Sequence, residues 1–363
     1  MGLGNAQMRY HWLDLVRFIA ALMVVLVHAR GHLFVDYGSL PVSDKTIGIA
    51  IFYALTRLGE EAVIAFFVLS GFLVGGRSMV KMVRGEFVPS SYAVDRIVRI
   101  MLPLAPALIY TAIVRLVVDG GFDGLGLIEN LFSLQGVVAP VFGGNAPLWS
   151  LSYEVWFYIL TFSIGLFWSG ESRYRALAIF VLVCFIFTRL DAAYLICWLI
   201  GGAAYFGISR SISRKVLLVA VPLTLYAVFS IQVARGSVSI PTVKYFAYLQ
   251  SREVSIILLS VGLALIIRQL VVSEPVSAVA RTIDRMGTQL AAPSYTLYLT
   301  HYPTLQLISY LGLVRQGKSI SLSSVGVFLF SVFVCLAVSY ILYLFFEKHT
   351  GAVRRWLKAV YLS

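Results

Sequence analysis

The sequence contains few charged residues for its length. Only 13% of its 363 residues are Asp, Glu, Lys or Arg, whereas 60% are hydrophobic, and the mean hydropathy is +0.88. A soluble core does not require this much apolar sequence. Runs of 18 or more apolar residues recur from end to end, and each can cross a hydrocarbon layer of roughly 30 Å. The scarcity of charge therefore excludes an ordinary soluble domain and favours an integral membrane protein.

The apolar runs also lack the alternation of apolar and polar residues that the strands of a membrane barrel show. Because a spanning segment must satisfy its own backbone hydrogen bonds, the alternative is the helix. The sequence predicts one all-α, membrane-embedded domain over 1–363, a polytopic bundle with no appended soluble domain. We expect about ten transmembrane helices, each placed to within several residues, at 12–33, 61–77, 97–118, 148–168, 174–190, 193–208, 215–233, 253–272, 291–313 and 322–346. Residues 47–58 form a short apolar segment that we expect at the membrane surface, and 125–142 a partly buried loop or re-entrant helix.

Cysteine is scarce as well. Cys184, Cys197 and Cys335 all lie within apolar runs, and they form neither a disulfide framework nor a CxxC metal motif. We therefore expect these side chains to pack in the core and expect no bound metal. The first apolar run contains Asp14 and Arg17 and lacks a clear small-residue cleavage site, which indicates a retained helix rather than a signal peptide.

Acidic residues are fewer than basic ones, 17 against 29, which gives a net charge of +12. Such a balance is compatible with a nucleic-acid partner, but basic cytoplasmic loops explain it more simply in a membrane protein. On the expected topology, 18 basic residues lie in one set of loops and 10 in the opposite set. This bias places both termini in the cytoplasm, and an even number of spans is consistent with that placement. We expect membrane lipids, and not nucleic acid, as the surroundings of the chain.

The expected helix at 12–33 carries polar residues that are costly inside a membrane. A charged group near the membrane centre costs roughly 2.5–3.5 kcal/mol on insertion, so Asp14, Arg17 and His28 are candidates for function. Arg17 and His28 are eleven residues apart, so they share one helix face and lie roughly 16 Å apart along the axis. Asp14 lies one turn before Arg17 and can pair with it. The stripe suits a long anionic ligand whose reactive end reaches His28. A stripe that only packs against other polar helices is the alternative.

The second expected helix contains a small-residue pair and two carboxylates. Ser70 and Gly71 form a notch that permits the close approach of a ligand or of another helix, and the two interpretations are equally favoured. Glu60 and Glu61 lie near the outer end of the same helix, where Glu61 is a candidate for substrate contact.

Two arginines mark the start of the third expected helix. Arg96 and Arg99 are three residues apart and share a helix face, where two guanidinium groups can hold phosphates. From the spacing alone, an ordinary basic anchor at the membrane surface is favoured. Glu347, at the end of the last expected helix, is a candidate salt-bridge partner for a cytoplasmic arginine.

Glu154 and His28 lie at similar depths below the outer membrane surface, counted along their own helices. A carboxylate that supports a histidine base is an arrangement that activates alcohols, so we expect Glu154 and His28 to form a catalytic pair. The residues around Glu154 are aromatic, and an interfacial aromatic belt is favoured over a sugar platform for Trp149, Tyr153, Trp156 and Tyr158. His301 is either a second polar contact in the same cavity or a structural histidine.

In their order along the chain, these segments resemble the acyltransferase 3 family of integral membrane acyltransferases. Members of this family O-acylate bacterial polysaccharides, lipopolysaccharide, peptidoglycan and related glycans. The resembling segments are LDLVRFIAALMVVLVHA, FFVLSGFLVGGR, RIVRIMLP, PLWSLSYEVWFY, SYTLYLTHYP and the terminal FFEK. Each segment is weak evidence alone, but six in the family's order are specific, and they cover nearly the whole chain.

The resemblance implies a multi-pass enzyme of the bacterial inner membrane that uses acyl-CoA, usually acetyl-CoA, as co-substrate. The acceptor it implies is a hydroxyl of a glycan or lipid-linked sugar. His28 is implied as the base or transient acyl carrier, and Glu154 as a further site residue. The residues that we assign from it to the coenzyme side are Arg17, Arg96, Arg99, Ser70 and, more weakly, Arg77.

The chain departs from the family at two positions near the outer end of the site. Family members often carry an acidic residue where this chain has Ile64, and a second one where it has Val155. Two other functions stay open. One is a transporter, because intramembrane charges also mark transport pathways, although no internal repeat is visible. The other is a relay that passes acyl groups to a partner transferase. The sequence also leaves open whether the protein forms a homo-oligomer.

Overall fold

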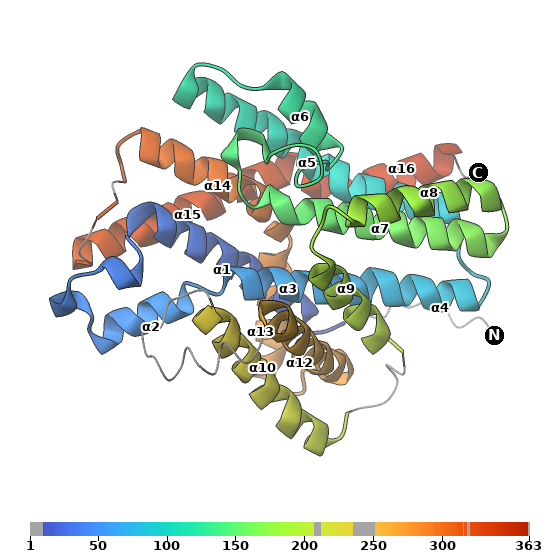
Figure 1. Ribbon diagram of the computed structural model, residues 1–363, viewed down its shortest axis with the longest axis horizontal. Helices are drawn as coiled ribbons and strands as arrows, with labels where there is room; N and C mark the ends of the chain where they lie inside the picture. Colours follow the sequence, from blue (N-terminus) through green and yellow to red (C-terminus); the bar gives the residue numbers. More distant parts are fainter. Residues whose placement is uncertain (1–9, 207–211, 235–250, 315, 318–319, 362–363) are drawn as a thin grey trace.

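The computed structural model describes residues 10–206, 212–234, 251–314, 316–317 and 320–361, and none of these residues forms a β-strand. Figure 1 shows the arrangement of its helices. The α-helices are α1 (Leu13–Leu33), α2 (Ile47–Leu55), α3 (Gly59–Ser70), α4 (Arg77–Val83), α5 (Pro89–Asp119), α6 (Gly124–Leu131), α7 (Leu148–Ser169), α8 (Arg173–Phe187), α9 (Ala192–Ala204), α10 (Arg214–Ala234), α12 (Arg252–Val272), α13 (Ala278–Ala291), α14 (Ser294–Tyr310), α15 (Leu322–Phe345) and α16 (Thr350–Tyr361). The all-α fold class predicted from the sequence is thus confirmed.

Several of these helices are long and apolar enough to cross a membrane. In the part of the chain that the structure describes, six stretches meet both conditions: Ile47–Val83, Pro89–Asp119, Leu148–Ser169, Arg214–Val233, Arg252–Val272 and Leu322–Tyr361. The shorter helices α8, α9 and α14 comprise 15, 13 and 17 residues, below the roughly 20 that a span across the hydrocarbon layer needs. The structure supports a membrane protein, and the total of about ten spans stays a prediction.

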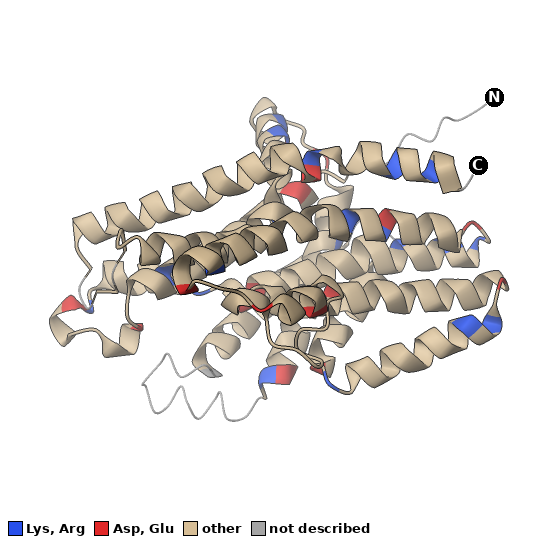
Figure 2. Ribbon diagram, turned by 90° about the horizontal axis from the view of Figure 1, so that it is seen from above, with Lys and Arg blue, Asp and Glu red and all other residues tan. Residues whose placement is uncertain are grey.

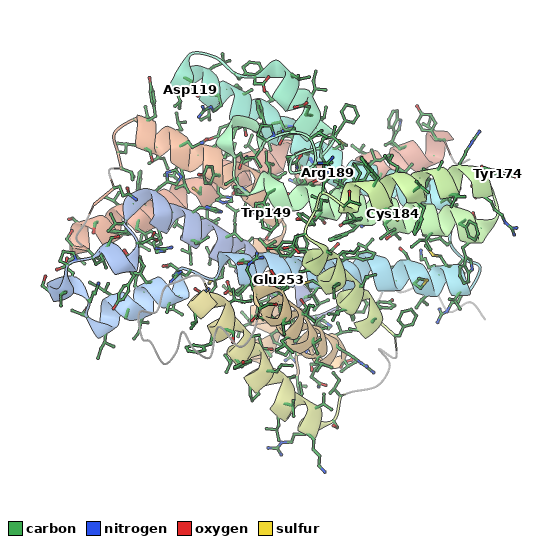
Figure 3. The ribbon with its side chains drawn as sticks, in the orientation of Figure 1. Asp119, Trp149, Tyr174, Cys184, Arg189 and Glu253 are labelled. Atoms are coloured by element: carbon green, nitrogen blue, oxygen red, sulfur yellow. The ribbon has the colours of Figure 1, made fainter. Side chains whose placement is uncertain are left out.

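The outer helices expose apolar side chains. On α8, the side chains of Leu177, Phe180, Val181, Leu182 and Phe185 are 40–59% exposed. Figure 3 shows α8 running from near the labelled Tyr174 toward the labelled Arg189, which follows its end, with side chains projecting outward. Apolar patches of this kind are rare on soluble monomers and are ordinary where a helix faces lipid. By contrast, α3 buries ten of its 12 residues and lies at the centre of the molecule.

Glycines allow α3 and its continuation to touch α9 directly. A Cβ atom built on Gly71 would lie 1.9 Å from the carbonyl oxygen of Trp198, and one on Gly201 would lie 2.1 Å from that of Val68. Between α3 and α4 the chain makes a π-helical turn over Gly71–Gly76, and single π-turns within a helix are frequent at functional sites. The helix-packing interpretation of Gly71 is therefore the one that the structure shows.

Two helix boundaries differ from those expected. The expected helix 97–118 is α5, which begins at Pro89, so Arg96 and Arg99 lie about two and about three turns inside the helix rather than at its start. Proline suits the first turn because its missing N–H would have no partner there. The expected helix 291–313 begins later, at Ser294, because Pro293 breaks the helical pattern after α13. The segment 125–142 contains the short helix α6 followed by turns.

The loops that connect the helices lie in two sets, one at each end of the molecule. In Figure 1 the junctions α4–α5 and α7–α8 and the helix α16 lie on the right, while α2 and the α14–α15 connection lie on the left. Figure 2 shows charged residues gathered mainly near helix ends and near the centre, with long uncharged stretches between. Six of the basic residues used for the charge bias lie outside the described residues: Arg9, Arg210, Arg235, Lys244, Arg315 and Lys318. The cytoplasmic placement of both termini stays a prediction.

Candidate active site

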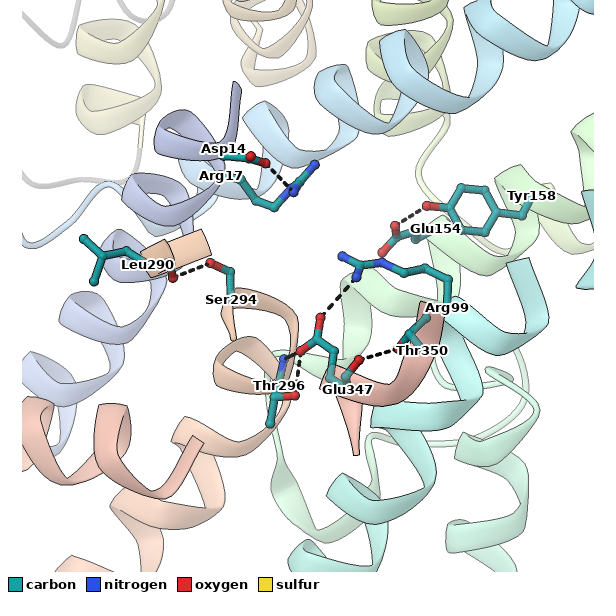
Figure 4. Close-up of polar contacts among 10 residues, drawn as sticks. All are labelled: Asp14, Arg17, Arg99, Glu154, Tyr158, Leu290, Ser294, Thr296, Glu347 and Thr350. Carbon is teal, nitrogen blue, oxygen red and sulfur yellow. Dashed lines mark hydrogen bonds and ion pairs between the residues drawn. The ribbon is translucent and has the colours of Figure 1, made fainter. Parts of the chain in front are cut away.

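A cavity of about 310 Å³ lies between α1, α3, α4, α5, α7 and α14, and we call it the arginine cavity. Four guanidinium groups line it: those of Arg17, Arg77, Arg96 and Arg99. Glu154 is the one carboxylate among its described lining residues, and Ser70 contributes a hydroxyl. All five residues assigned to the coenzyme side thus surround one space. Figure 4 shows the side chains of Arg17, Arg99 and Glu154 pointing toward one another from three helices.

Two of these arginines are held by carboxylates. Arg17 Nη1 lies 3.0 Å from Asp14 Oδ1, which is the pairing expected from their i, i+3 spacing. Arg99 Nη1 lies 3.1 Å from Glu347 Oε1, so Glu347 does pair with an arginine, as expected. Arg96 lies with its guanidinium carbon 5.4 Å from the ring centre of Tyr158, and its Nε has no hydrogen-bond partner among the described residues.

A chain of hydrogen bonds crosses the wall of the arginine cavity. The hydroxyl of Ser70 donates to the hydroxyl of Tyr158 over 3.4 Å, and Tyr158 donates to Glu154. Tyr158 lies one helical turn after Glu154 on α7, so both side chains lie on the same face of that helix. The hydrogen bond from Tyr158 therefore orients the carboxylate of Glu154.

A second cavity, of about 470 Å³, adjoins the first, and we call it the histidine cavity. His28 lines it together with Trp149 and Tyr153, while Val63 and Tyr298 line both cavities. The α1 stripe thus places Arg17 in one cavity and His28 in the next. This is the two-ended arrangement that the spacing of the stripe indicates.

The structure does not bring Glu154 and His28 into one cavity. Helix α7 presents two neighbouring stripes: Glu154 and Tyr158 face the arginine cavity, and Trp149 and Tyr153 face the histidine cavity. Two residues at equal depth in the membrane need not face each other, because depth does not determine how each helix is rotated about its axis. His28 is instead in contact with the rings of His301 and Tyr302, at centroid distances of 5.4 and 5.1 Å.

His301 is fully buried beside His28 and is not among the residues that line the histidine cavity. Its Nδ1 lies 2.9 Å from the carbonyl oxygen of Leu297, which fixes Nδ1 as the protonated nitrogen. Its Nε2 has no hydrogen-bond partner in the described part of the chain. His301 therefore packs behind His28, and a direct contact with substrate stays a prediction.

Two expectations for the outer end of the site differ from the structure. Glu61 lines neither cavity, because its carboxylate accepts a hydrogen bond from Gln232 of α10. Its neighbour Glu60, rotated by about 100° on the helix, lines the histidine cavity instead. The belt interpretation of the aromatic residues on α7 is wrong, because the side chains of Trp149, Tyr153, Trp156 and Tyr158 are buried or partly buried in the core.

The residues that sequence reasoning missed line the histidine cavity: Asp191, Tyr194, Arg252 and Tyr298. Asp191 and Arg252 lie at the starts of α9 and α12, and no local pattern relates them to the polar stripe of α1. No group of three or more His, Cys, Asp or Glu residues that could hold a metal occurs among the described residues. Cys197 and Cys335 are buried and Cys184 is exposed, and all three are free thiols.

The family model for an acyltransferase domain, that of the acyltransferase 3 family, matches residues 10–344. The chain belongs to this acyltransferase family. A similar protein is acyltransferase MdmB of Streptomyces mycarofaciens, with 30% identity over 152 residues, 41% of this chain and 37% of that protein. The match thus spans less than half of the relative's length. No solved structure matches the chain.

Both cavities lie within the residues that the family model matches. The arginine cavity and His28 therefore lie within the matched domain, and the six apolar stretches of the described residues support a membrane protein.

Proposed function

We propose that this acyltransferase transfers an acyl group, most simply acetyl, from cytoplasmic acyl-CoA to a sugar hydroxyl of an extracytoplasmic or membrane-linked glycan. The observation that carries the proposal is the arginine cavity, whose described lining residues include four arginines and one carboxylate, that of Glu154. Arginine binds phosphate bidentately and keeps its charge when partly buried, so the cavity favours a donor that carries phosphates.

The walls of the arginine cavity suit the uncharged part of such a donor. Apolar side chains from α3 and the π-turn line one side, among them Phe66, Leu69 and Leu73. An acyl-pantetheine arm has the length and apolar character to pass along them, with its phosphates held by the arginines. Because Asp14 and Glu347 fix two of the guanidinium groups, these groups are oriented before the donor arrives.

His28 supplies the chemistry in this proposal. It accepts the proton of the acceptor hydroxyl while the hydroxyl oxygen attacks the thioester carbonyl. The carbon–sulfur bond then breaks, and the departing thiolate takes the proton from His28, so the products are the sugar ester and the coenzyme thiol. Tyr298 and Val63 line both cavities, so the reacting groups would meet beside them.

The arrangement of the loops supports donor access from the cytoplasm. Arg77, Arg96 and Arg99 belong to helices α4 and α5, whose junction lies at the same end of the molecule as α16. The sequence assigns this end to the cytoplasmic side through its excess of basic residues. We place the enzyme in a bacterial inner membrane on the basis of the same charge bias and of the bacterial glycans on which the family acts.

The test is transfer of radiolabelled acetyl from acetyl-CoA to glycan by the purified chain in liposomes. We expect His28→Ala to lower the turnover rate by about 10²–10⁴-fold, the contribution of a general base. Arg17→Ala should raise the KM for acetyl-CoA by about tenfold or more, since it removes a charged hydrogen-bond donor. His32→Ala, one turn after His28 and outside both cavities, is the matched control and should stay close to wild type.

Full activity in both His28→Ala and Arg17→Ala would exclude this mechanism. Acetyl-CoA binding without transfer by the purified chain would instead identify a relay that requires a partner transferase. Absence of acetyl-CoA binding would favour the transporter interpretation.

A further inference from the structure

His28 does not share a cavity with Glu154, the carboxylate that the sequence predicts as its partner. A histidine that acts as a base is oriented by a further group, and the hydrogen bond of one ring nitrogen determines which nitrogen stays free to take a proton. In this protein the orienting group must therefore be another hydrogen-bond acceptor that lies beside the ring of His28.

Two residues of α14 contact the ring of His28. The ring centre of His301 lies 5.4 Å from that of His28, with 36° between the ring planes, and the ring centre of Tyr302 lies 5.1 Å away at 85°. Tyr302 also contacts His32, one turn after His28 on α1, at 5.2 Å. Helix α1 thus meets α14 along a face of aromatic rings, and on that face His301 is the neighbour of His28 that carries ring nitrogens.

The tautomer of His301 leaves one of these nitrogens as an acceptor without a partner. Its Nδ1 donates to the carbonyl oxygen of Leu297 over 2.9 Å, so Nδ1 carries the proton and Nε2 carries a lone pair. The residue is 0% exposed, and Nε2 has no hydrogen-bond partner among the described residues. Buried polar atoms are nearly always hydrogen-bonded, because an unsatisfied one costs stability. An acceptor that stays unpaired beside the ring of His28 therefore points to a role in the reaction.

Contacts from outside α14 hold His301 in place. Pro303 has no N–H, so the carbonyl of Leu299, four residues earlier, lacks its helical donor. Asn145 donates to that carbonyl over 2.9 Å, and the thiol of Cys335 on α15 donates to the carbonyl of His301 over 3.6 Å. The turn of α14 that carries His301 is thus fixed from two sides, as the support of a functional side chain requires.

On the proposed function, we infer that His301 is the positioning residue of His28, and that its Nε2 accepts a hydrogen bond from a ring N–H of His28. The other ring nitrogen of His28 then faces the acceptor hydroxyl as the base. When His28 takes the proton of that hydroxyl, its ring becomes positively charged, and the hydrogen bond to Nε2 stabilises this charge in the buried site. His301 neither gains nor loses a proton, and His28 passes its own to the departing thiolate.

In the structure the rings of His28 and His301 are in contact without a hydrogen bond between them. Catalytic hydrogen bonds are often long or poorly aligned before the substrate binds and shorten in the reacting complex. The inference therefore requires only a small turn of the His28 ring, which lines the histidine cavity.

A purely structural role for His301 predicts a different order of two variants. The amide of His301→Asn reaches the position of Nδ1 and can keep the hydrogen bond to Leu297, but it has no atom at the position of Nε2. The amide of His301→Gln extends one methylene further and places an acceptor near the position of Nε2. If His301 only stabilises α14, asparagine is the better substitute. If His301 positions His28, glutamine is.

The experiment uses the full chain in liposomes, radiolabelled acetyl-CoA and deacylated surface glycan of the source bacterium, with rates referred to folded protein. We expect His301→Asn to lower the turnover rate by about 10- to 100-fold, the effect of losing a hydrogen bond to a charged group. The KM values for acetyl-CoA and for glycan should stay unchanged, because His301 lines neither cavity. His301→Gln should recover most of the rate. Thr300→Val is the matched control, since Thr300 is equally buried on α14 and its hydroxyl donates to the carbonyl of Thr296.

A double variant tests whether His301 acts through His28. In that case His301→Asn changes the residual rate of His28→Ala by less than about twofold, whereas independent effects multiply. The inference is overturned if the two effects multiply, or if His301→Asn is at least as active as His301→Gln. Both comparisons require transfer by the wild-type chain. A wild-type chain that transfers no label would refute the proposed function itself, so the two failures are distinguishable.

Discussion

Glu347 ties three helices together beside the arginine cavity. Its Oε1 pairs with Arg99 of α5, and its Oε2 accepts hydrogen bonds from the backbone N–H and the hydroxyl of Thr296 on α14, at 3.0 and 2.7 Å. The carboxylate side chain is 3% exposed, so its three contacts replace nearly all of its hydration. The residue both orients Arg99 and joins α14 to the end of α15 (Figure 4).

We expect Glu347→Ala to lower the free energy of unfolding by about 2–3 kcal/mol. Breaking a buried ion pair costs more than this, but Arg99 is 38% exposed and regains water when its partner is lost. Glu347→Gln should cost less, because its amide oxygen can still accept from Thr296. Unfolding in detergent micelles measures both variants, with Glu171→Ala in an exposed loop as the control. A melting curve for Glu347→Ala that matches wild type would contradict this account of the residue.

The interactions of single residues could be predicted from the sequence where the two partners lie within one or two turns of each other on the same helix. Asp14 and Arg17 are three residues apart, and their pairing follows from helix geometry alone. Glu60 and Arg252 are 192 residues apart, and only the packing of α12 on α3 brings them together. The cost of intramembrane charge identified the stripe on α1, but it gives no information about residues near helix ends, where charge is common.

At the scale of helices, the contact of α9 with the π-turn Gly71–Gly76 is the tightest constraint on the site. Gly71 follows Ser70, which lines the arginine cavity, and its Cα faces the backbone of Trp198. A shift of α9 away from this turn would move Ser70 and the wall of the cavity with it. The fold thus positions one side of the donor site through a backbone-to-backbone contact.

We expect Gly71→Ala to destabilise the protein by about 2 kcal/mol or more, because its Cβ would lie 1.9 Å from the carbonyl oxygen of Trp198. Gly31→Ala on α1 is the control, since a Cβ there meets no atom within 4 Å and alanine favours the helix by about 1 kcal/mol. Thermal unfolding in detergent measures both. Equal melting temperatures for the two variants would show that α3 and α9 do not pack as described.

Helices were predictable where an apolar run exceeds the length of a span, and less so where it does not. The amphipathic helices α13 and α16 were missed, because their polar faces lower the mean hydropathy of any window that contains them. The rotation of α7 was also beyond prediction. Its sequence contains two polar stripes, and the packing of α7 against α5, α8 and α9 decides which stripe meets which cavity.

At the scale of the whole molecule, composition predicts a helical membrane protein. The charge bias of the loops predicts its orientation in the membrane. The apolar runs require a helical membrane protein, and the structure supplies two sets of loops at opposite ends (Figure 1). Ser43, after α1, is exposed in one set, and Glu171, between α7 and α8, is exposed in the other. Because donor and acceptor are expected on opposite sides of the membrane, the position of these loops bears directly on the mechanism.

Single cysteines in these two loops test the orientation. In a background in which Cys184, Cys197 and Cys335 are replaced by alanine, we expect Ser43→Cys to react with a membrane-impermeant maleimide in intact spheroplasts. Glu171→Cys should react only after the membrane is opened, because the basic residues Arg173 and Arg175 beside it hold that loop in the cytoplasm. Lysed samples, in which both variants must react, control for accessibility. Labelling of Glu171→Cys in intact spheroplasts would reverse the orientation, and the arginine cavity would then open away from the cytoplasmic pool of acyl-CoA.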